Sequence, residues 1–436
     1  YSGPLPVVTT LREGSSSAGE EWFGTIGEHT RFDKVYAGAE LQEIIPWYFE
    51  EDLFRNNEAG VLYDFSDRST LFQNANGTIP VIGDNQPVGL VLDKHSWHGL
   101  TLDQVIARQL ELNNPSSRTL ATISGGTAVE DPVGTISLTG SGEAESAVAD
   151  QFFTTVVGQT YRLVADVNTN STGLKIGSTQ NGTQILNTTA FGTGTQVVYM
   201  FRATATTTWI RWYKTATNTT VISNISIKQI PGNHAYQATA GSRPMYRTNG
   251  KYHKLKFDGV DDFLSFGNIG WDGTGDYTFI CGSRISDTYT TNSGFINFGN
   301  SGVATSYPGM SILLRGTSSS PTRSIQRFTT TSSTVISASG PGNSYPIGEN
   351  TVLSVNRSRS IRINGNTVSL SGNDAIDFTG YNSSYNRIGS SYTYQNTNAF
   401  NGEMSFLLLR VAPTSDIILK AIEKRIARKM EGVTIT

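Results

Sequence analysis

Residues 232–266 read GNHAYQATAGSRPMYRTNGKYHKLKFDGVDDFLSF, and the second half of this stretch decides the fold. Its apolar residues are interrupted by the dipeptide Asp258-Gly259 and by the acidic pair after it; they are Leu255, Phe257, Val260, Phe263, Leu264 and Phe266. Asp-Gly supports the positive φ that tight turns between antiparallel strands require. The stretch therefore predicts two β-strands joined by a hairpin turn at Asp258-Gly259.

The rest of the C-terminal third continues this pattern of short strands. Strands are predicted at residues 277–285, 295–298 and 310–315, with Gly, Ser, Thr and Asn between them. Two more are predicted at residues 352–355 and 361–363, and the dipeptide Asn364-Gly365 after them favours a type I′ turn. Short strands at regular intervals are typical of a β-sandwich, so the region is predicted to be an antiparallel sandwich.

Two helices are predicted outside the strands. In TLDQVIARQLELNNP, Thr101 and Gln104 form a capping box, Leu110 is the last apolar position of the helical face, and Pro115 ends the segment. A second helix closes the chain from Ser415 or Asp416, and its apolar face is formed by Ile418, Ile422, Ile426 and Met430.

A second β unit is predicted over residues 121–230. Its strands are suggested by TISLTG, FFTTVV, TYRLVADVN, GLKIGS, VVYMFRAT, TTWIRWYK and VISNISIKQI, each bounded by Gly, Asn or Thr. The fold class predicted for the whole chain is therefore mainly β, with two antiparallel β-sandwiches, an N-terminal mixed region and a short C-terminal helix.

Several of these segments resemble one family of proteins. The pattern "QATA..RP..R" followed by "L.FDG.DD.L" resembles the start of the concanavalin A-like, or laminin-G-like, domain that ends many tailed-phage structural proteins. AGVLYDFSDRSTLFQNANGTIPVIGDNQPVGLVLDKHS, at residues 59–96, resembles the segment that precedes the sandwiches in those proteins. The unit at 121–230 resembles a jelly-roll module of the carbohydrate-binding kind, which such proteins often carry at this position.

This resemblance implies a domain order. Residues 1–118 would form an N-terminal assembly or attachment region, 119–231 a carbohydrate-binding-module-like jelly roll, 232–250 a linker, and 251–436 the concanavalin A-like sandwich with its helix. Because the sequence starts at Tyr1, residues are expected to be missing before it.

The composition argues against two classes of binding partner, nucleic acids and membranes. Charged residues make up 16% of the chain, the formal net charge is −3, and Lys and Arg form no dense run, so nucleic-acid binding is not expected. No apolar run approaches the roughly 18 residues of a membrane span, so no membrane insertion is expected. The one cysteine, Cys281, lies in an apolar strand and is interpreted as a buried hydrophobic residue.

The candidate binding residues lie in WIRWYK. Side chains alternate along a strand, so Trp209, Arg211 and Tyr213 share one face, and Ile210 and Trp212 share the other. If Ile210 and Trp212 face the core, the first three form an exposed row of rings and hydrogen-bonding groups that suits a glycan or a partner protein. The alternative is that these rings only cover the sheet or pack on a neighbouring domain.

Asp258, Asp261 and Asp262 are the candidate metal ligands. Laminin-G-like domains sometimes hold calcium with carboxylate and carbonyl oxygens, so calcium is the one possible cofactor. The spacing does not match an EF-hand loop, and stabilisation of the turn by aspartate side chains is the favoured interpretation. No cofactor is predicted otherwise.

No catalytic residue is predicted. The strand motif E-x-D-x-E of concanavalin-like glycosidases and the G-x-S-x-G motif are both absent, and His95 and His98 have no evident nucleophile beside them.

The chain is therefore expected to be a virion structural protein rather than an enzyme. It would be exposed on tail or capsid, contact other virion proteins and host-surface polysaccharide, and form a homo-oligomer. The alternatives are a host polysaccharide depolymerase and a purely structural decoration protein without glycan binding.

Overall fold

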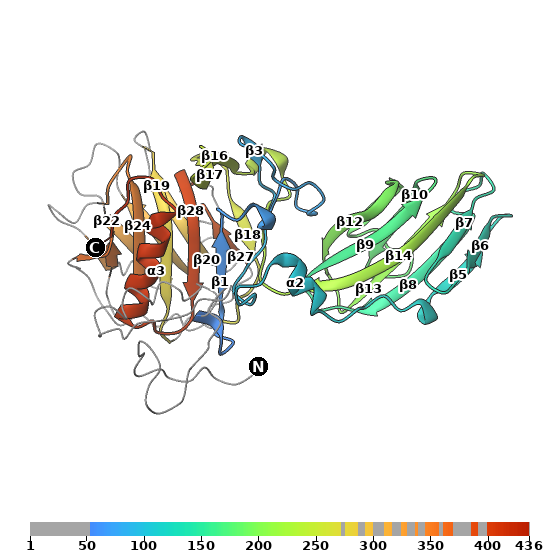
Figure 1. Cartoon of the computed structure of the whole chain (residues 1–436), viewed down its shortest axis with the longest axis horizontal. Coiled ribbons are helices and arrows are strands. Elements are labelled where there is room, and N and C mark those ends of the chain that lie inside the picture. Colours follow the sequence, from blue (N-terminus) through green and yellow to red (C-terminus); the bar gives the residue numbers. More distant parts are fainter. Residues whose placement is uncertain are drawn as a thin grey trace, which may run out of the picture.

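The computed structural model of the protein is mainly β, with antiparallel strand pairing, as the sequence predicts. Two β-sandwiches lie side by side along the long axis of the molecule (Figure 1). Of the N-terminal mixed region, residues 1–52 lie outside the described part of the chain. The structure describes residues 53–271, 275–286, 293–299, 309–315, 324–328, 336–338, 345–356, 361–368, 385–390 and 399–435.

The larger unit, called the host sandwich here, consists of two antiparallel sheets whose buried faces enclose one apolar core. The first sheet runs in the order β26 (Asn366–Val368), β25 (Ile361–Ile363), β24 (Asn350–Asn356), β19 (Thr278–Ile285), β28 (Asn401–Arg410), β17 (His253–Asp258), β16 (Met245–Thr248) and β3 (Gln86–Pro87), and β1 (Gly60–Asp64) also pairs with β28. The second runs in the order β2 (Leu71–Phe72), β4 (Leu90–Val91), β15 (Ala235–Tyr236), β18 (Leu264–Phe266), β27 (Tyr385–Ile388), β20 (Ser293–Gly299), β21 (Gly309–Arg315), β22 (Ser324–Phe328) and β23 (Ile336–Ala338).

The smaller unit, called the inserted sandwich, has its own core between two five-stranded antiparallel sheets. One sheet has the order β11 (Leu186–Phe191), β10 (Thr172–Gly177), β13 (Thr207–Lys214), β8 (Ala147–Thr154) and β5 (Thr119–Thr122). The other has the order β12 (Gly194–Arg202), β9 (Thr160–Asn168), β14 (Thr219–Ile230), β7 (Ile136–Thr139) and β6 (Thr127–Glu130).

Strand pairing crosses two of the predicted domain boundaries. β1 and β3, from the predicted N-terminal region 1–118, pair with β28 and β16 of the host sandwich. β15 and β16, from the predicted linker 232–250, are also strands of that sandwich. Backbone groups buried in a sheet need hydrogen-bond partners, and residues far apart in the chain supply them here. The sandwich at 119–230 is thus inserted between two parts of the same host.

The turn at Asp258-Gly259 differs from the predicted hairpin. Gly259 has a positive φ of 78°, as the sequence predicts for a tight turn. However, β17 before it pairs with β16 and β28 in the first host sheet, whereas β18 after it pairs with β15 and β27 in the second. The dipeptide therefore forms a corner between the two sheets.

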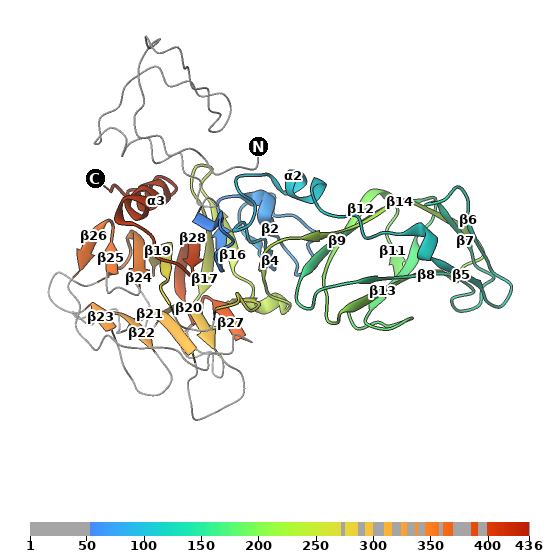
Figure 2. The same cartoon turned by 90° about the horizontal axis from the view of Figure 1, so that it is seen from below.

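The two predicted helices are present, with one difference in length. At α2 (Leu102–Ala107) the Thr101 capping box is formed, but the helix ends at Ala107, and Leu110 is 77% exposed instead of lying on a buried face. α3 (Asp416–Arg428) begins after Ser415 and lies against the first host sheet (Figure 2). Its Ile422 and Ile426 share an apolar cluster with residues of that sheet. Short 3-10 helices cover Arg68–Thr70, Pro115–Ser117 and Ala240–Ser242. Among the described residues, no helix has the length and apolar character of a membrane span.

The two chain segments that enter and leave the inserted sandwich meet at Asp93. This carboxylate is fully buried and accepts hydrogen bonds from the backbone N–H groups of Leu62 at 2.8 Å, His95 at 3.0 Å and Asn233 at 2.7 Å. It also contacts His95 Nδ1 at 2.6 Å. In return, the Asp93 N–H donates to His234 Nδ1 at 2.9 Å. One side chain thereby joins the outgoing segment, the returning segment and strand β1.

An apolar cluster surrounds this crossing and bridges the two sandwiches. Trp97 is 1% exposed, and its indole N–H donates to the Pro231 carbonyl at 3.2 Å. Met200 of the inserted sandwich is buried in the same cluster, and its N–H donates to the Asn76 carbonyl at 2.9 Å. The cluster consists of Phe72, Leu90, Leu92, Trp97, Val105, Ile106, Met200 and Ile230.

Candidate functional site

The candidate residues of WIRWYK lie on β13, the middle strand of the sheet β11-β10-β13-β8-β5. Ile210 and Trp212 are each 1% exposed and belong to the core of the inserted sandwich. Strand alternation therefore places Trp209, Arg211 and Tyr213 together on the outer face of the sheet. This outer face is called the Trp209 face below.

Trp209 forms an aromatic pair with Phe152, its direct partner on β8. The ring centroids are 4.9 Å apart and the planes are tilted by 37°. Phe152 is 51% exposed, whereas its neighbour Phe153 is 6% exposed and lies in the core. Phe152 was not among the binding residues predicted from the sequence. Phe152 lies within β8, and its pairing with Trp209 depends on a strand register that the sequence alone does not specify.

Arg211 is the centre of an ion-pair network beside the aromatic pair. Its guanidinium makes a two-pronged contact with Asp150, from Nε to Oδ1 and from Nη2 to Oδ2, each at 2.7 Å. Nη1 donates to Glu145 at 3.0 Å, and Glu145 also pairs with Lys175. Hydrogen bonds to the two carboxylates, opposed by partial burial, raise the pKa of Arg211. The Arg211 donors are thus directed at the protein itself, so this residue positions carboxylates and does not offer a free fork to a ligand.

Tyr213 is covered, in contrast to the exposed row predicted from the sequence. It is 6% exposed, and its ring lies flat over Gly173 on β10, where an added Cβ would lie 2.1 Å from the ring. Its hydroxyl donates to the Thr188 carbonyl at 3.1 Å, and Lys175 Nζ lies 5.4 Å from the ring centroid. A glycine opposite the tyrosine lets the ring lie against the sheet, so Tyr213 holds β10 and β11 in place.

The three candidate metal ligands lie together at the corner between the host sheets. Ligand atoms of Asp258, Asp261 and Asp262 are within 4.8 Å of one another. Asp258 Oδ1 accepts the N–H of Val260 at 2.8 Å, and Asp262 Oδ2 accepts the N–H of Asp258 at 2.9 Å. Burial, together with the charges of the other two aspartates, raises the pKa of Asp262 to about 7. Asp258 and Asp262 thus accept N–H groups of the turn itself, and Asp261 accepts the Ser242 hydroxyl at 2.6 Å. Calcium binding by these carboxylates stays a prediction from the sequence.

Two further reactive side chains, Cys281 and His95, are buried or paired within the protein itself. Cys281 is fully buried, and burial raises the pKa of its thiol to about 12, as expected of a buried hydrophobic residue. His95 pairs with Asp93, as described above, and not with His98.

Comparison with known proteins gives no family. No protein-family model matches the chain, and no curated protein matches it. A sialidase from Trypanosoma rangeli is 13% identical with a TM-score of 0.29, and the alignment covers 44% of this chain and 31% of the sialidase. A putative carbohydrate binding protein from Bacteroides ovatus is 13% identical with a TM-score of 0.29, over 70% of this chain and 84% of that one. A truncated protein with CBM32 and alginate lyase domains is 14% identical with a TM-score of 0.23, over 68% and 99%. TM-scores this low carry no argument about activity.

Proposed function

We propose that this chain is a surface protein of a tailed-phage particle that adheres to saccharide through the Trp209 face. The observation that carries the binding function is the Phe152–Trp209 pair, in which one large ring is 51% exposed and the two centroids are 4.9 Å apart. Exposed aromatic pairs beside polar groups suit the C–H faces of sugar rings, which stack on aromatic surfaces while their hydroxyls find hydrogen bonds.

Polar groups for those hydroxyls gather at Arg211, two residues along β13 from Trp209. The Glu145 carboxylate is partly exposed and keeps lone pairs beyond those used by Arg211, since a carboxylate offers about four acceptor sites. Asp150 is 3% exposed and fixes Arg211 and Gln180 in place. Gln180 and Asn181 lie in the turn after β10, are exposed, and contact Asp150 and Lys175 respectively. The face thus combines a stacking surface with acceptors and amides in fixed positions, which favours hydroxyl-rich ligands over purely apolar ones.

The Phe152→Ala and Trp209→Ala variants are expected to lose saccharide binding. Each truncation removes a stacked ring worth about 1.5–3 kcal/mol when buried, so the affinity should fall roughly 10- to 100-fold. A glycan array with wild type and both variants, followed by titration calorimetry on a positive glycan, measures this change. Tyr213→Phe is the matched aromatic control and should bind normally, because that ring is covered in the protein itself.

Wild-type protein that binds no glycan would contradict the binding function and favour the purely structural alternative. Cleavage of a bound polysaccharide would favour the depolymerase.

The particle assignment rests on the resemblance of residues 59–96 and 232–266 to tailed-phage structural proteins, and it has its own test. Proteomics of purified particles and immunogold labelling should find the chain in the virion, on its exposed surface. Absence from purified particles would rule out a virion role while leaving the saccharide-binding experiment valid.

A further inference from the structure

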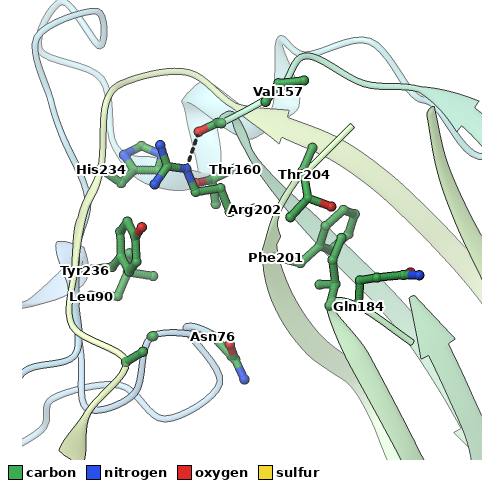
Figure 3. Close-up of a pocket in the computed structure, with 15 residues that line it drawn as sticks. Asn76, Leu90, Val157, Thr160, Gln184, Phe201, Arg202, Thr204, His234 and Tyr236 are labelled. Atoms are coloured by element: carbon green, nitrogen blue, oxygen red, sulfur yellow. Dashed lines mark hydrogen bonds between the residues drawn. The ribbon is translucent and has the colours of Figure 1, made fainter. Parts of the chain in front are cut away.

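A second candidate site lies between the two sandwiches, away from the Trp209 face. It is a cavity of about 520 Å³, within the range of roughly 300–1,000 Å³ that is typical of small-ligand sites. As Figure 3 shows, Asn76, Leu90, His234 and Tyr236 lie on the side of the host sandwich. Phe201, Thr204 and Gln184 lie on the side of the inserted sandwich, and Arg202 reaches across between the two.

Arg202, at the end of β12, is the charged residue of this lining, and no Asp or Glu belongs to the described residues around the cavity. Its Nε–H donates to the Gly158 carbonyl at 2.8 Å, and its guanidinium carbon lies 5.0 Å from the centre of the Tyr236 ring. The ion pairs found in the described part of the chain do not include Arg202. In contrast to Arg211, Arg202 therefore keeps the two Nη groups of its planar fork available.

Two glycines, Gly158 and Gly267, lie close to one arm of the Arg202 fork. Gly267 lies beside it, and an added Cβ on Gly267 would lie 2.8 Å from Arg202 Nη2. His234 adds no charge, because burial lowers its pKa to about 4 and Nδ1 accepts the Asp93 N–H. The Ile230 carbonyl lies near this ring, although His234 Nε2 has no hydrogen bond of normal geometry. Asp93, behind His234, is paired with His95. The positive charge at the cavity is thus that of Arg202.

The rest of the lining offers rings and hydrogen-bonding groups. Tyr236 provides aromatic surface, and Asn76, Gln184 and Thr204 are exposed polar side chains. Phe201 also belongs to the lining, but it is 3% exposed and lies in the core of the inserted sandwich. Gln184 Oε1 accepts the Ser178 N–H at 3.1 Å, which leaves its NH₂ group for another partner. The lining thus joins a cation with aromatic surface, amides and hydroxyls.

We infer that this cavity binds the carboxylate of an acidic saccharide, held by Arg202 and seated between the two sandwiches. A guanidinium fork matches a carboxylate in two parallel hydrogen bonds, which an ammonium group does not. A monosaccharide ring fits the cavity volume, and its hydroxyls fit the amides and the threonine. The inference concerns a different surface from the proposed function and does not depend on it.

Titration of the full chain with sodium glucuronate and with glucose tests this inference, because the two sugars differ only in a carboxylate against a CH₂OH group. Glucuronate is expected to bind at least about tenfold more tightly than glucose. Arg202→Met should reduce glucuronate affinity about tenfold or more, and Arg202→Lys should restore only part of it. Arg108→Met, at an exposed arginine after α2, is the matched control and should change nothing.

Arg202 contacts both sandwiches, so its replacement also removes contacts between them. A second variant therefore leaves Arg202 unchanged. Thr204→Trp adds a ring at an exposed lining position and should abolish glucuronate binding while the circular dichroism spectrum stays that of wild type. Equal binding of glucose, unchanged binding in Arg202→Met, or inorganic phosphate bound as tightly as glucuronate would each overturn the inference. The carboxylate preference measured here is expected to follow Arg202 and Thr204, whereas binding at the Trp209 face is expected to follow Phe152 and Trp209, so failure of one is distinguishable from failure of the other.

Discussion

Replacement of Asp93 by alanine is expected to lower the free energy of unfolding by about 3–5 kcal/mol. The carboxylate is fully buried and accepts three backbone N–H groups in addition to the His95 ring. Alanine leaves these donors without partners in the interior, and a buried unsatisfied donor costs about 1–3 kcal/mol. Urea denaturation measures the total loss, and hydrogen exchange should show that the amides of Leu62 and Asn233 lose protection.

Asp103→Ala is the matched control for this variant. Asp103 is exposed in the first turn of α2, where a carboxylate contributes only about 0.3–1 kcal/mol through the helix dipole. If Asp93→Ala cost no more than Asp103→Ala, or if the Leu62 and Asn233 amides stayed protected, the carboxylate would not hold the crossing together.

The loss in Asp93→Ala should depend on pH. Burial opposes ionisation of Asp93, but His95 and the N–H donors outweigh it and lower its pKa below the ordinary 3.8. Burial likewise opposes protonation of His95, but Asp93 outweighs it and raises its pKa above the ordinary 6.5. The contribution of ionised Asp93 to the free energy of unfolding is complete above about pH 4 and is lost on acidification. The contribution of protonated His95 is complete below about pH 6.5 and is lost at higher pH. The difference between wild type and variant should therefore be largest between these values.

Replacement of Glu423 by leucine is expected to cost about 3–5 kcal/mol, because it leaves Arg362 charged and unpaired in the interior. Glu423 is fully buried on α3 and Arg362 is 5% exposed on β25. Arg362 donates from Nε and Nη2 to the two Glu423 oxygens, each at 2.9 Å, and the Ser354 hydroxyl donates to the same carboxylate at 2.7 Å. Urea denaturation, with the far-ultraviolet signal of α3 as a second probe, measures the loss.

The double variant Arg362→Met/Glu423→Leu separates pairing from packing. Removal of both charges leaves apolar groups of similar volume, a change that is often neutral or stabilising in other proteins. The double variant should therefore be more stable than Glu423→Leu alone. Additive losses in the double-mutant cycle would show that the two side chains act independently and that the ion pair does not hold α3 on the sheet.

Local features of the fold could be predicted from the sequence wherever a short pattern determines them. The Thr101 capping box, the Asn364-Gly365 turn with both φ angles positive, and the apolar face of α3 are all contained in a few neighbouring residues. The end of α2 could not be predicted, because Leu110 continues the helical spacing while its surroundings leave it in solvent.

Features that depend on contacts between residues far apart in the chain could not be predicted from the sequence. Asp258-Gly259 has the composition of a hairpin, yet it becomes a corner because β17 pairs with β28, more than a hundred residues later. Likewise, alternation alone placed Trp209, Arg211 and Tyr213 on one face, but only the register across from Gly173 and Phe152 determines which ring is covered and which is exposed.

The crossing at Asp93 bears on how the protein can gain or exchange domains in evolution. Since the outgoing and returning segments meet at one carboxylate, the roughly 140 residues between Asp93 and Asn233 begin and end at nearly the same point in space. Insertions are tolerated best where their two ends lie close together. The inserted sandwich at 119–230 can therefore be exchanged as a unit. Another domain whose ends lie close together could be inserted at the same point of the host sandwich. The protein could then acquire a new binding specificity while the host sandwich stays unchanged.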